Sequence, residues 1–367
     1  MILMNDFKVE PPELHQAMLG AASRVLESGW YVLGREVEVF ERQWATECGV
    51  AYGIGVGNGM DAIEIALRSL GIGPGDEVIT TPMTAFATVL AIVRAGATPV
   101  LADIDRQTAL MSIDSARRCI TLRTKAIVLV HLYGQIRAMD AWTELCAARG
   151  ILLVEDCAQA HLASLNGNMA GSFGAAGAFS FYPTKNLGAV GDAGMLVSDD
   201  EALARKAGKL RNYGQSVRYY HPEMGLNSRL DEMQAAILGE RLKWLPEFTT
   251  RRREIADAYL SGIDNPLVKC MAVPESPQAH VYHLFVVNCV QRDKLQAHLR
   301  THQVQTHIHY PIPIHQQESC LNIARDPLGL AISEHHAATC LSIPCHPQMA
   351  DAEVDAVIAA LNSFSGE

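Results

Sequence analysis

The chain has 367 residues, of which 49 % are hydrophobic and 19 % are charged. This composition excludes a disordered chain, and the length suits two or three lobes of about 100 to 200 residues each. Forty Asp and Glu residues against 30 Lys and Arg residues give a formal net charge of -10, which argues against a binder of nucleic acid or of anionic membranes.

Nine cysteines stand singly in the chain and form no Cys-x-x-Cys pair. Because their number is odd and the chain is long, we expect reduced thiols in the core of a cytoplasmic protein. The first residues lack a basic segment followed by a long apolar run, and no apolar run is long enough to span a bilayer. We therefore expect neither a signal peptide nor a membrane segment.

The first two thirds of the chain alternate between helical and strand patterns. Apolar residues at helical spacing predict helices over about 12–28 and 35–48, from about 59, and over 84–95 and 140–150. Short apolar runs predict strands within 73–81, 98–105, 125–134, 151–160, 177–186 and 193–200. Repeated strand–helix units of this length predict an α/β fold with a mostly parallel sheet and helices on both faces.

The pattern changes after residue 210. Residues 211–232 are polar, aromatic and aperiodic, as expected for a functional or interface segment. Helices are predicted within 231–262, a strand over 280–290, a helix over 292–302, a strand running into a Pro-rich loop over 304–315, and a last helix from about 350. We expect a large domain over residues 1–245 and a smaller α/β domain over residues 246–367.

Two residues that could bind a cofactor lie at or just after the ends of predicted strands. Asp156 ends the apolar run ILLVED, and Lys185 lies in SFYPTKN. Ligands bind at the carboxyl ends of parallel strands. A lysine that is neutral part of the time can form an imine with an aldehyde cofactor, and a carboxylate facing a pyridine nitrogen keeps that nitrogen protonated. The alternative is an ordinary loop lysine and a helix-capping aspartate.

The segment GVGNGMDAIEIAL predicts an anion site, because a glycine-rich turn exposes backbone amides at the start of a helix. Ser180 offers a further hydroxyl donor. A dinucleotide site is the less favoured alternative, since the glycines do not follow the Gly-x-Gly-x-x-Gly spacing. A tight turn without a ligand remains the other alternative.

Aromatic residues and histidines supply further candidates. Phe86 begins a predicted helix after a strand and is suited either to stacking on a flat ring or to the core. His307, His309 and His315 invite a zinc site, but no Asp, Glu or Cys lies near them in sequence, so we expect no metal. One face of their strand is expected to line a polar pocket, with surface histidines as the alternative.

Several motifs together resemble one family. GNGMDAIEIAL, GIGPGDEVI, EDCAQAHLA, SFYPTKNLGAVGDAG, RNYG and GLNSRLDEMQAAIL occur in this order, with SGWYVLG before them and HYPIPIHQQ after them. Over about residues 5–345 the chain resembles the DegT/DnrJ/EryC1/StrS family of sugar aminotransferases. The resemblance implies the aspartate-aminotransferase-like fold (fold type I), pyridoxal 5'-phosphate as cofactor, and a homodimer with two shared active sites.

The resemblance also assigns residues to the cofactor. Lys185 matches the catalytic lysine that forms the Schiff base, Asp156 matches the carboxylate on the pyridine nitrogen, and Gln159 matches the neighbour of the ring hydroxyl. Phe86 matches the aromatic residue that stacks on the ring, and Asn227 matches the asparagine that reaches the phosphate in the neighbouring subunit. The phosphate cup is matched by Ser180 together with the amides of Gly59, Met60 and Asp61. Many members have Thr where this chain has Met60, so one hydroxyl contact is expected to be missing. Related dehydratases carry His at the lysine position, so Lys185 favours transamination.

The substrate is predicted from a weaker resemblance to one branch of the family. The segments LVHLYGQ, NYGQSVRYYH, HVYHLFVV and HYPIPIHQQ are most similar to the branch that aminates nucleotide-linked, usually dTDP-linked, 3-keto-6-deoxyhexoses. This implies amino transfer from L-glutamate, release of 2-oxoglutarate, and a 3-amino sugar for a glycan such as an O-antigen or for a natural product. Tyr182, His309, Tyr310 and His315 are predicted to bind the sugar nucleotide.

Three alternatives to this function stay open. The first is a C-4 aminotransferase acting on a 4-keto-6-deoxyhexose. The second is a non-catalytic regulator with the same fold, which the presence of Lys185, Asp156 and Ser180 disfavours. The third is a nicotinamide-dependent oxidoreductase, which the glycine spacing disfavours.

Overall fold

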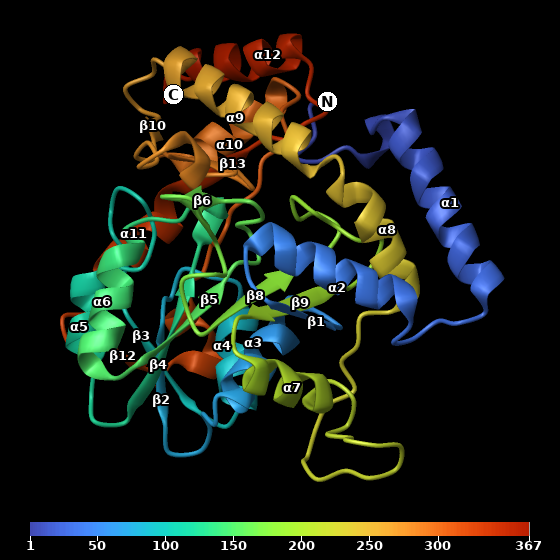
Figure 1. Ribbon diagram of the computed structural model, residues 1–367. Coiled ribbons are helices and arrows are strands. Elements are labelled where there is room, and N and C mark those ends of the chain that lie inside the picture. The colour runs from blue at the N-terminus through green and yellow to red at the C-terminus, as the bar shows by residue number, and fades with distance from the viewer. Residues whose placement is uncertain (367) are drawn as a thin grey trace.

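An eight-stranded sheet forms the centre of the computed structural model, which describes residues 1–366 (Figure 1). Its strands lie in the order β1-β9-β8-β5-β4-β2-β3-β12. Only β9 runs against its neighbours, so the predicted mostly parallel α/β sheet is confirmed. The strand bounds are β1 Tyr52–Val56, β2 Glu77–Thr80, β3 Thr98–Leu101, β4 Thr124–Val130, β5 Leu152–Asp156, β8 Ala176–Ser180, β9 Gly194–Ser198 and β12 Ala324–Arg325.

The central strands are apolar on both faces because both faces of the sheet are covered. In β4, Ile127 and Leu129 belong to one hydrophobic cluster, whereas Ala126 and Val128 belong to another. Side chains alternate between the two faces of a strand, so these two clusters lie on opposite sides of the sheet. A near-continuous apolar run is therefore the pattern expected for such a strand.

Helices cover both faces, as predicted (Figure 1). On one face lie α2 (Arg35–Cys48), α5 (Ile113–Cys119), α6 (Met139–Arg149) and α8 (Glu232–Leu242). On the other lie α3 (Gly59–Ser69), α4 (Phe86–Arg94) and α7 (Glu201–Leu210). The predicted first helix is confirmed as α1 (Pro12–Ser28), which ends at the left-handed Gly29 and packs on α8.

The C-terminal part has its own core. The antiparallel strands β10 (Lys269–Cys270), β11 (Phe285–Asn288) and β13 (Cys340–Ile343) pack with α9 (Leu245–Gly262), α10 (Arg292–Thr301) and α12 (Asp351–Asn362). Helix α11 (Ala331–Thr339) precedes β13, and β12 joins the large sheet beside β3. The division at residues 245 and 246 falls at the start of α9 and stays a prediction.

The strand predicted over residues 304–315 is wrong. This segment contributes only isolated bridges, from Val304 to Ile2 and from His307 to Ser342. Pro311 and Pro313 lack backbone N–H groups, so the rest of the segment cannot extend a ladder. The strand predicted over 280–290 is confirmed only at its centre, as β11.

All nine cysteines are free, and eight of them are buried; Cys270 is partly exposed. Within residues 1–366, none of the helices combines the length and the apolar character that crossing a bilayer requires.

Candidate active site

The carboxyl ends of four strands bring the predicted site residues to one edge of the large sheet. Asp156 is the last residue of β5, and Ser180 is the last residue of the adjacent parallel strand β8. Lys185 follows five residues after Ser180. Gly59 opens α3 after β1, and Phe86 opens α4 after β2. This edge is where α/β sheets of this kind bind ligands.

Lys185 is held near Asp156 without forming a direct ion pair with it. The Lys185 amide donates to the carbonyl of Tyr182 at 2.8 Å, which closes a turn. Burial lowers the pKa of Lys185 to about 8, and the Asp156 carboxylate opposes this shift. No oxygen of Asp156 lies within 4.0 Å of the lysine nitrogen in the described chain. The arrangement thus provides an amine that loses its proton readily and leaves space between the two groups.

Asp156 is fixed by two donors, one for each oxygen. The Thr88 hydroxyl donates to Oδ2 at 2.8 Å, and the Ala158 amide donates to Oδ1 at 3.2 Å. Behind Thr88, the hydroxyl of Thr84 lies 2.7 Å away. The sequence analysis missed both threonines; Thr84 precedes α4 and Thr88 lies in its first turn.

The start of α3 has features that suit the predicted phosphate cup. Asn58 caps the helix by accepting from the Asp61 amide at 2.9 Å, so that amide is already bonded. The amides of Gly59 and Met60 belong to the first turn, where a helix offers no internal acceptor. A Cβ on Gly59 would lie 2.7 Å from the Ser180 Cβ, which shows how closely Ser180 approaches the helix. Amides, helix dipole and hydroxyl fit a phosphate group.

A second network ties the segment around residue 309 to the site. The carbonyl of the Gln159 side chain accepts from the Tyr133 amide at 2.6 Å, and its amide lies 3.4 Å from the Tyr310 hydroxyl. The Tyr133 hydroxyl donates to the His309 carbonyl at 2.6 Å and lies 2.9 Å from His336 Nε2. The predicted residues Gln159, His309 and Tyr310 are therefore brought together, through a tyrosine and a histidine that the sequence analysis missed.

Histidines and a tyrosine near Lys185 are held neutral at pH 7. Burial lowers the pKa of His309 to about 4, and the neighbouring His307 and Lys185 add to this shift. Burial and the Lys185 charge likewise lower the pKa of His161 to about 3 and hold that of His283 well below its usual value. Burial and Asp156 raise the pKa of Tyr310 to about 12. Asp156 is the acidic neighbour whose charge opposes the lowering of the Lys185 pKa.

Four predicted residues lie apart from these networks. Phe86 is 41 % exposed, which excludes the alternative of a core residue, and Tyr182 is 52 % exposed. Asn227 is exposed and accepts from Arg229 Nη2 at 2.5 Å. His315 is buried and lies 2.9 Å from Glu334 of α11. The roles assigned to these four residues stay predictions.

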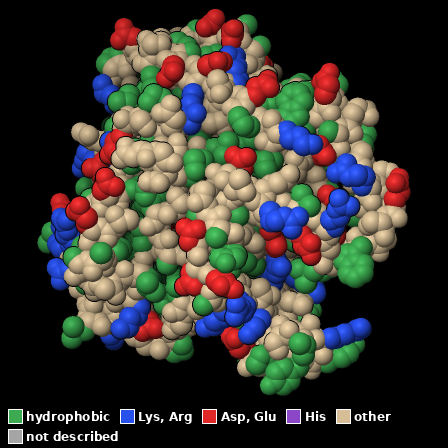
Figure 2. Space-filling view, viewed as in Figure 1, with side chains coloured by type: hydrophobic (Ala, Val, Ile, Leu, Met, Phe, Trp, Pro, Cys, Tyr) green, Lys and Arg blue, Asp and Glu red, His purple; other side chains and the backbone are tan. Residues whose placement is uncertain are grey.

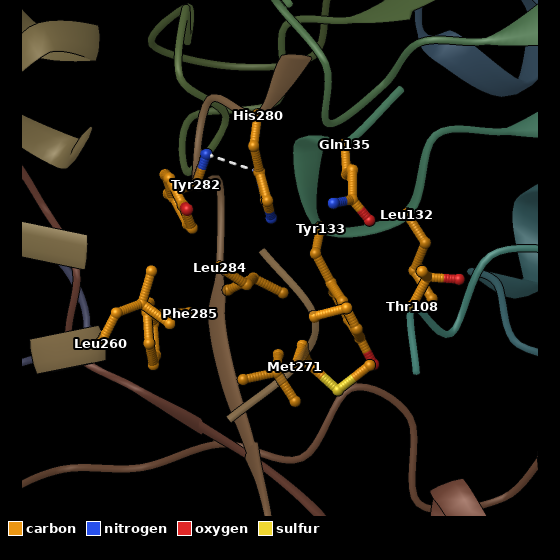
Figure 3. Close-up of a pocket in the computed structure, with 12 residues that line it drawn as sticks. Thr108, Leu132, Tyr133, Gln135, Leu260, Met271, His280, Tyr282, Leu284 and Phe285 are labelled. Atoms are coloured by element: carbon orange, nitrogen blue, oxygen red, sulfur yellow. Dashed lines mark hydrogen bonds between the residues drawn. The ribbon is translucent and has the colours of Figure 1, made fainter. Parts of the chain in front are cut away.

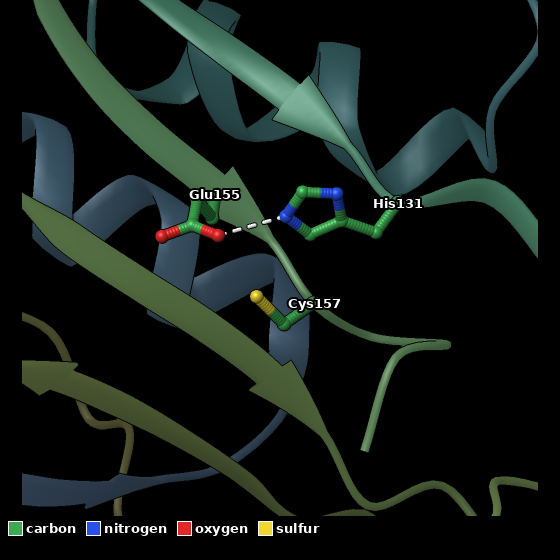
Figure 4. Close-up of side chains that lie close together, drawn as sticks. All are labelled: His131, Glu155 and Cys157. Carbon is green, nitrogen blue, oxygen red and sulfur yellow. Dashed lines mark hydrogen bonds and ion pairs between the residues drawn. The ribbon is translucent and has the colours of Figure 1, made fainter. Parts of the chain in front are cut away.

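One buried group of metal-binding residue types lies beneath the site. His131, Glu155 and Cys157 lie close together (Figure 4). Both Glu155 oxygens already accept hydrogen bonds, from His131 Nε2 and from the amides of Gly171, Phe173 and Gly174, at 2.8 to 3.0 Å. Burial holds the pKa of the Cys157 thiol well above its usual value, so no thiolate is offered. These contacts assign the group a structural role.

A small cavity lies beside Tyr133 (Figure 3). Gln135, His280 and Met271 are among the residues that line it, and its volume is about 20 Å³. That is room for about one water molecule. It is too small for a cofactor or a sugar.

Known proteins resemble the chain over nearly its whole length. The model of the DegT/DnrJ/EryC1/StrS aminotransferase family matches residues 12–362. The dTDP-3-amino-3,6-dideoxy-alpha-D-galactopyranose transaminase of Aneurinibacillus thermoaerophilus is 46 % identical over 352 residues, covering 96 % of this chain and 95 % of that protein.

Two crystal structures show the same fold. DesV of Streptomyces venezuelae has a TM-score of 0.95 and 41 % identity, covering 98 % of this chain and 97 % of DesV. NtdA of Bacillus subtilis, with bound cofactor PMP, has a TM-score of 0.88 and 30 % identity, covering 96 % of this chain and 82 % of NtdA. The aminotransferase fold inferred from the sequence is thereby confirmed, and the chain belongs to the DegT/DnrJ/EryC1/StrS aminotransferase family.

Proposed function

We propose that the protein is a pyridoxal-phosphate-dependent aminotransferase that moves an amino group from L-glutamate to a nucleotide-linked keto-sugar. The main supporting observation is that Asp156 ends β5 and Lys185 lies in the loop after the adjacent strand β8, with the pKa of Lys185 lowered to about 8 by burial. At pH 7 an amine with this pKa is neutral in roughly one molecule in ten. Family membership and the relatives named above support the same reaction.

The residues at the sheet edge are suited to hold the cofactor. Lys185 would bind its aldehyde carbon, Asp156 its ring nitrogen, and Gly59, Met60 and Ser180 its phosphate. Phe86 and Gln159 would contact the ring. When bound, the cofactor supplies an electron sink for the carbanion formed from the amino acid. With its amine free, Lys185 would accept the proton from the α-carbon of the amino-acid donor and deliver it to the carbon of the cofactor that carries the amino nitrogen.

The proposed acceptor is a dTDP-linked 3-keto-6-deoxyhexose, which would become a 3-amino sugar for a surface glycan such as an O-antigen or for a natural product. The relative from A. thermoaerophilus is named for a dTDP-3-amino-3,6-dideoxy sugar. Tyr182, His309, Tyr310 and His315 are the proposed sugar-nucleotide residues. Because the imidazole of His309 is neutral, it would accept or donate a hydrogen bond without adding charge beside Lys185.

The active site is proposed to be completed in a homodimer in the cytoplasm. Hydrophobic side chains gather on the loop after α7, at the lower right of Figure 2. In this loop Val217, Tyr219, Tyr220 and Met224 are 63–87 % exposed. Contiguous exposed apolar surface is typical of an interface. Asn227 lies just beyond this loop, as expected for a residue that reaches a neighbouring subunit. The free, mostly buried thiols support a reducing compartment.

Incubation with dTDP-3-keto- and dTDP-4-keto-6-deoxyhexoses and L-glutamate, followed by NMR of the products, tests the proposal. We expect an amine at C3 and one 2-oxoglutarate for each amino sugar, and no product with Lys185→Ala. If only the 4-keto sugar were aminated, the protein would be a C-4 aminotransferase instead. No transfer to either sugar would favour the non-catalytic regulator.

A further inference from the structure

A chain of buried hydroxyl groups leads from α4 to the carboxylate that faces Lys185. Thr84, Thr88 and Asp156 are 3 %, 1 % and 6 % exposed, respectively. The two contacts of the chain measure 2.7 Å between the threonine hydroxyls and 2.8 Å from Thr88 Oγ1 to Asp156 Oδ2. Bulk water is thus excluded from replacing either hydroxyl.

The donor order in this chain follows from chemistry. An ionised carboxylate only accepts hydrogen bonds, so the single hydroxyl proton of Thr88 points at Asp156 Oδ2. Thr84 must then donate to Thr88, because the Thr88 proton is already used. The Thr88 hydroxyl therefore accepts from Thr84 while it donates to Asp156, which strengthens the bond to the carboxylate. The other oxygen, Oδ1, receives the backbone amide of Ala158.

We infer that Thr88, supported by Thr84, is a positioning residue that holds Asp156 charged and oriented toward the ring nitrogen of the bound cofactor. The inference rests on the proposed role of Asp156. A hydrogen bond donated to a carboxylate favours its charged form, and only the charged form keeps a pyridine nitrogen protonated. Thr88 lies on α4 and Asp156 on β5, 68 positions apart in sequence, so this contact also fixes the helix against the strand.

The test uses holoenzyme loaded with pyridoxal phosphate labelled with 15N in its ring. Thr88→Val keeps the shape of the side chain and removes the hydroxyl, whereas Thr88→Ser keeps the hydroxyl. We expect Thr88→Val to move the ring 15N resonance away from the wild-type position and to lower kcat about tenfold, with KM for glutamate within about twofold. Thr88→Ser should have the wild-type 15N resonance and the wild-type kcat. Thr84→Val should shift the resonance in the same direction by less.

A wild-type 15N resonance and wild-type kcat in Thr88→Val would overturn the inference, even if the variant were less stable. Should Thr88→Val fail to fold, Thr88→Ala is judged by the same readouts. Asp156→Asn separates this inference from the proposed function. If Asp156→Asn moves the resonance and Thr88→Val does not, only the role of Thr88 fails. If Asp156→Asn leaves the resonance unchanged, the proposed role of Asp156 fails.

Discussion

Burial changes the pKa of Lys185 more strongly than the nearby charge of Asp156 does. Desolvation lowers the pKa of this lysine from 10.5 to about 8, although the carboxylate favours the charged form. Below pH 8 the lysine is protonated in both the folded and the unfolded chain, so the folded state carries the full desolvation cost. Between pH 8 and 10.5 the unfolded chain binds more protons, so the cost is relieved as the pH rises.

The first prediction follows from this linkage. In cofactor-free protein at pH 7, Lys185→Met should raise the free energy of unfolding by about 1 to 3 kcal/mol, since it removes a desolvated charge. The gain should shrink as the pH rises from 8 through 10.5. Urea unfolding at pH 7, 8.5 and 10 measures this gain in stability. Lys125→Met is the control, because Lys125 is exposed. A gain that stays constant over this range would contradict the account.

Sequence patterns predicted some residues of the candidate site but not others. Asp156 and Lys185 were predictable because each follows a strand, and strand ends of a parallel sheet share one edge. Thr88 and Tyr133 were not, because their partners, Asp156 and His309, lie 68 and 176 positions away. Such contacts depend on the rotation of a helix and the path of a loop, which apolar periodicity does not specify.

At the scale of elements, the start of α3 depends on the absence of a side chain at Gly59. A Cβ there would lie 2.7 Å from the Ser180 Cβ and 3.1 Å from its Cα. Real Cβ atoms do not approach so closely, so the helix start and the end of β8 would have to separate.

Gly59→Ala should therefore weaken cofactor binding about tenfold or more and cost about 1 to 3 kcal/mol of stability. Gly208→Ala in α7 is the matched control, because a Cβ at Gly208 meets nothing within 4 Å. A helix prefers alanine to glycine, so the control should be about 0.5 to 1 kcal/mol more stable. Cofactor titration and urea unfolding measure both variants. Wild-type cofactor affinity in Gly59→Ala would show that the cup has another location.

Strand β5 ends with two carboxylates, which point to opposite faces of the sheet. Asp156 faces the candidate site, whereas Glu155 is fully buried and holds His131 and the turn at residues 171–174. Glu155→Gln replaces one acceptor oxygen with an amide that meets donors. We expect a loss of about 2 to 4 kcal/mol in the free energy of unfolding. Because these contacts leave no ligand sites, EDTA or zinc should not change the wild-type Tm. A Tm lowered by EDTA would contradict the structural role.

The long periodic helices and most strands of the large sheet were predicted well, whereas the two-residue strands were not. The helices α1, α2 and α12 appear at their expected places. The segment 304–315 was predicted as a strand running into a Pro-rich loop, but only isolated bridges form there. The strands β10 and β12 have two residues each, too few to show a period, and β12 pairs with β3 across more than 200 residues.

At the scale of the whole molecule, a second apolar area flanks the start of α8. Trp30, Tyr31 and Val190 are 63 %, 50 % and 59 % exposed. The Tyr31 carbonyl accepts from the Glu232 amide, and the Val190 amide donates to the Gln234 side chain, so both segments lie beside α8. Exposed Trp and Tyr side chains on fixed backbone are typical centres of an interface.

Trp30→Ala should raise the dissociation constant of the proposed homodimer about ten- to a hundredfold and reduce cofactor retention with it. Sedimentation velocity across a dilution series measures the association. Leu122→Ala is the control, since Leu122 is fully exposed but lies between α5 and β4. An unchanged dimer in Trp30→Ala, or a monomeric wild type at micromolar concentration, would contradict this assignment.

The most direct measurement of the central claim is to reduce the protein loaded with pyridoxal phosphate with borohydride and to map the modified lysine by mass spectrometry. Among the lysines of the chain, Lys185 combines a pKa lowered to about 8 with a place beside Asp156 at the sheet edge. The cofactor mass is therefore predicted on the peptide that contains Lys185 and absent from Lys185→Ala. Attachment to a different lysine, or to none, would contradict the account.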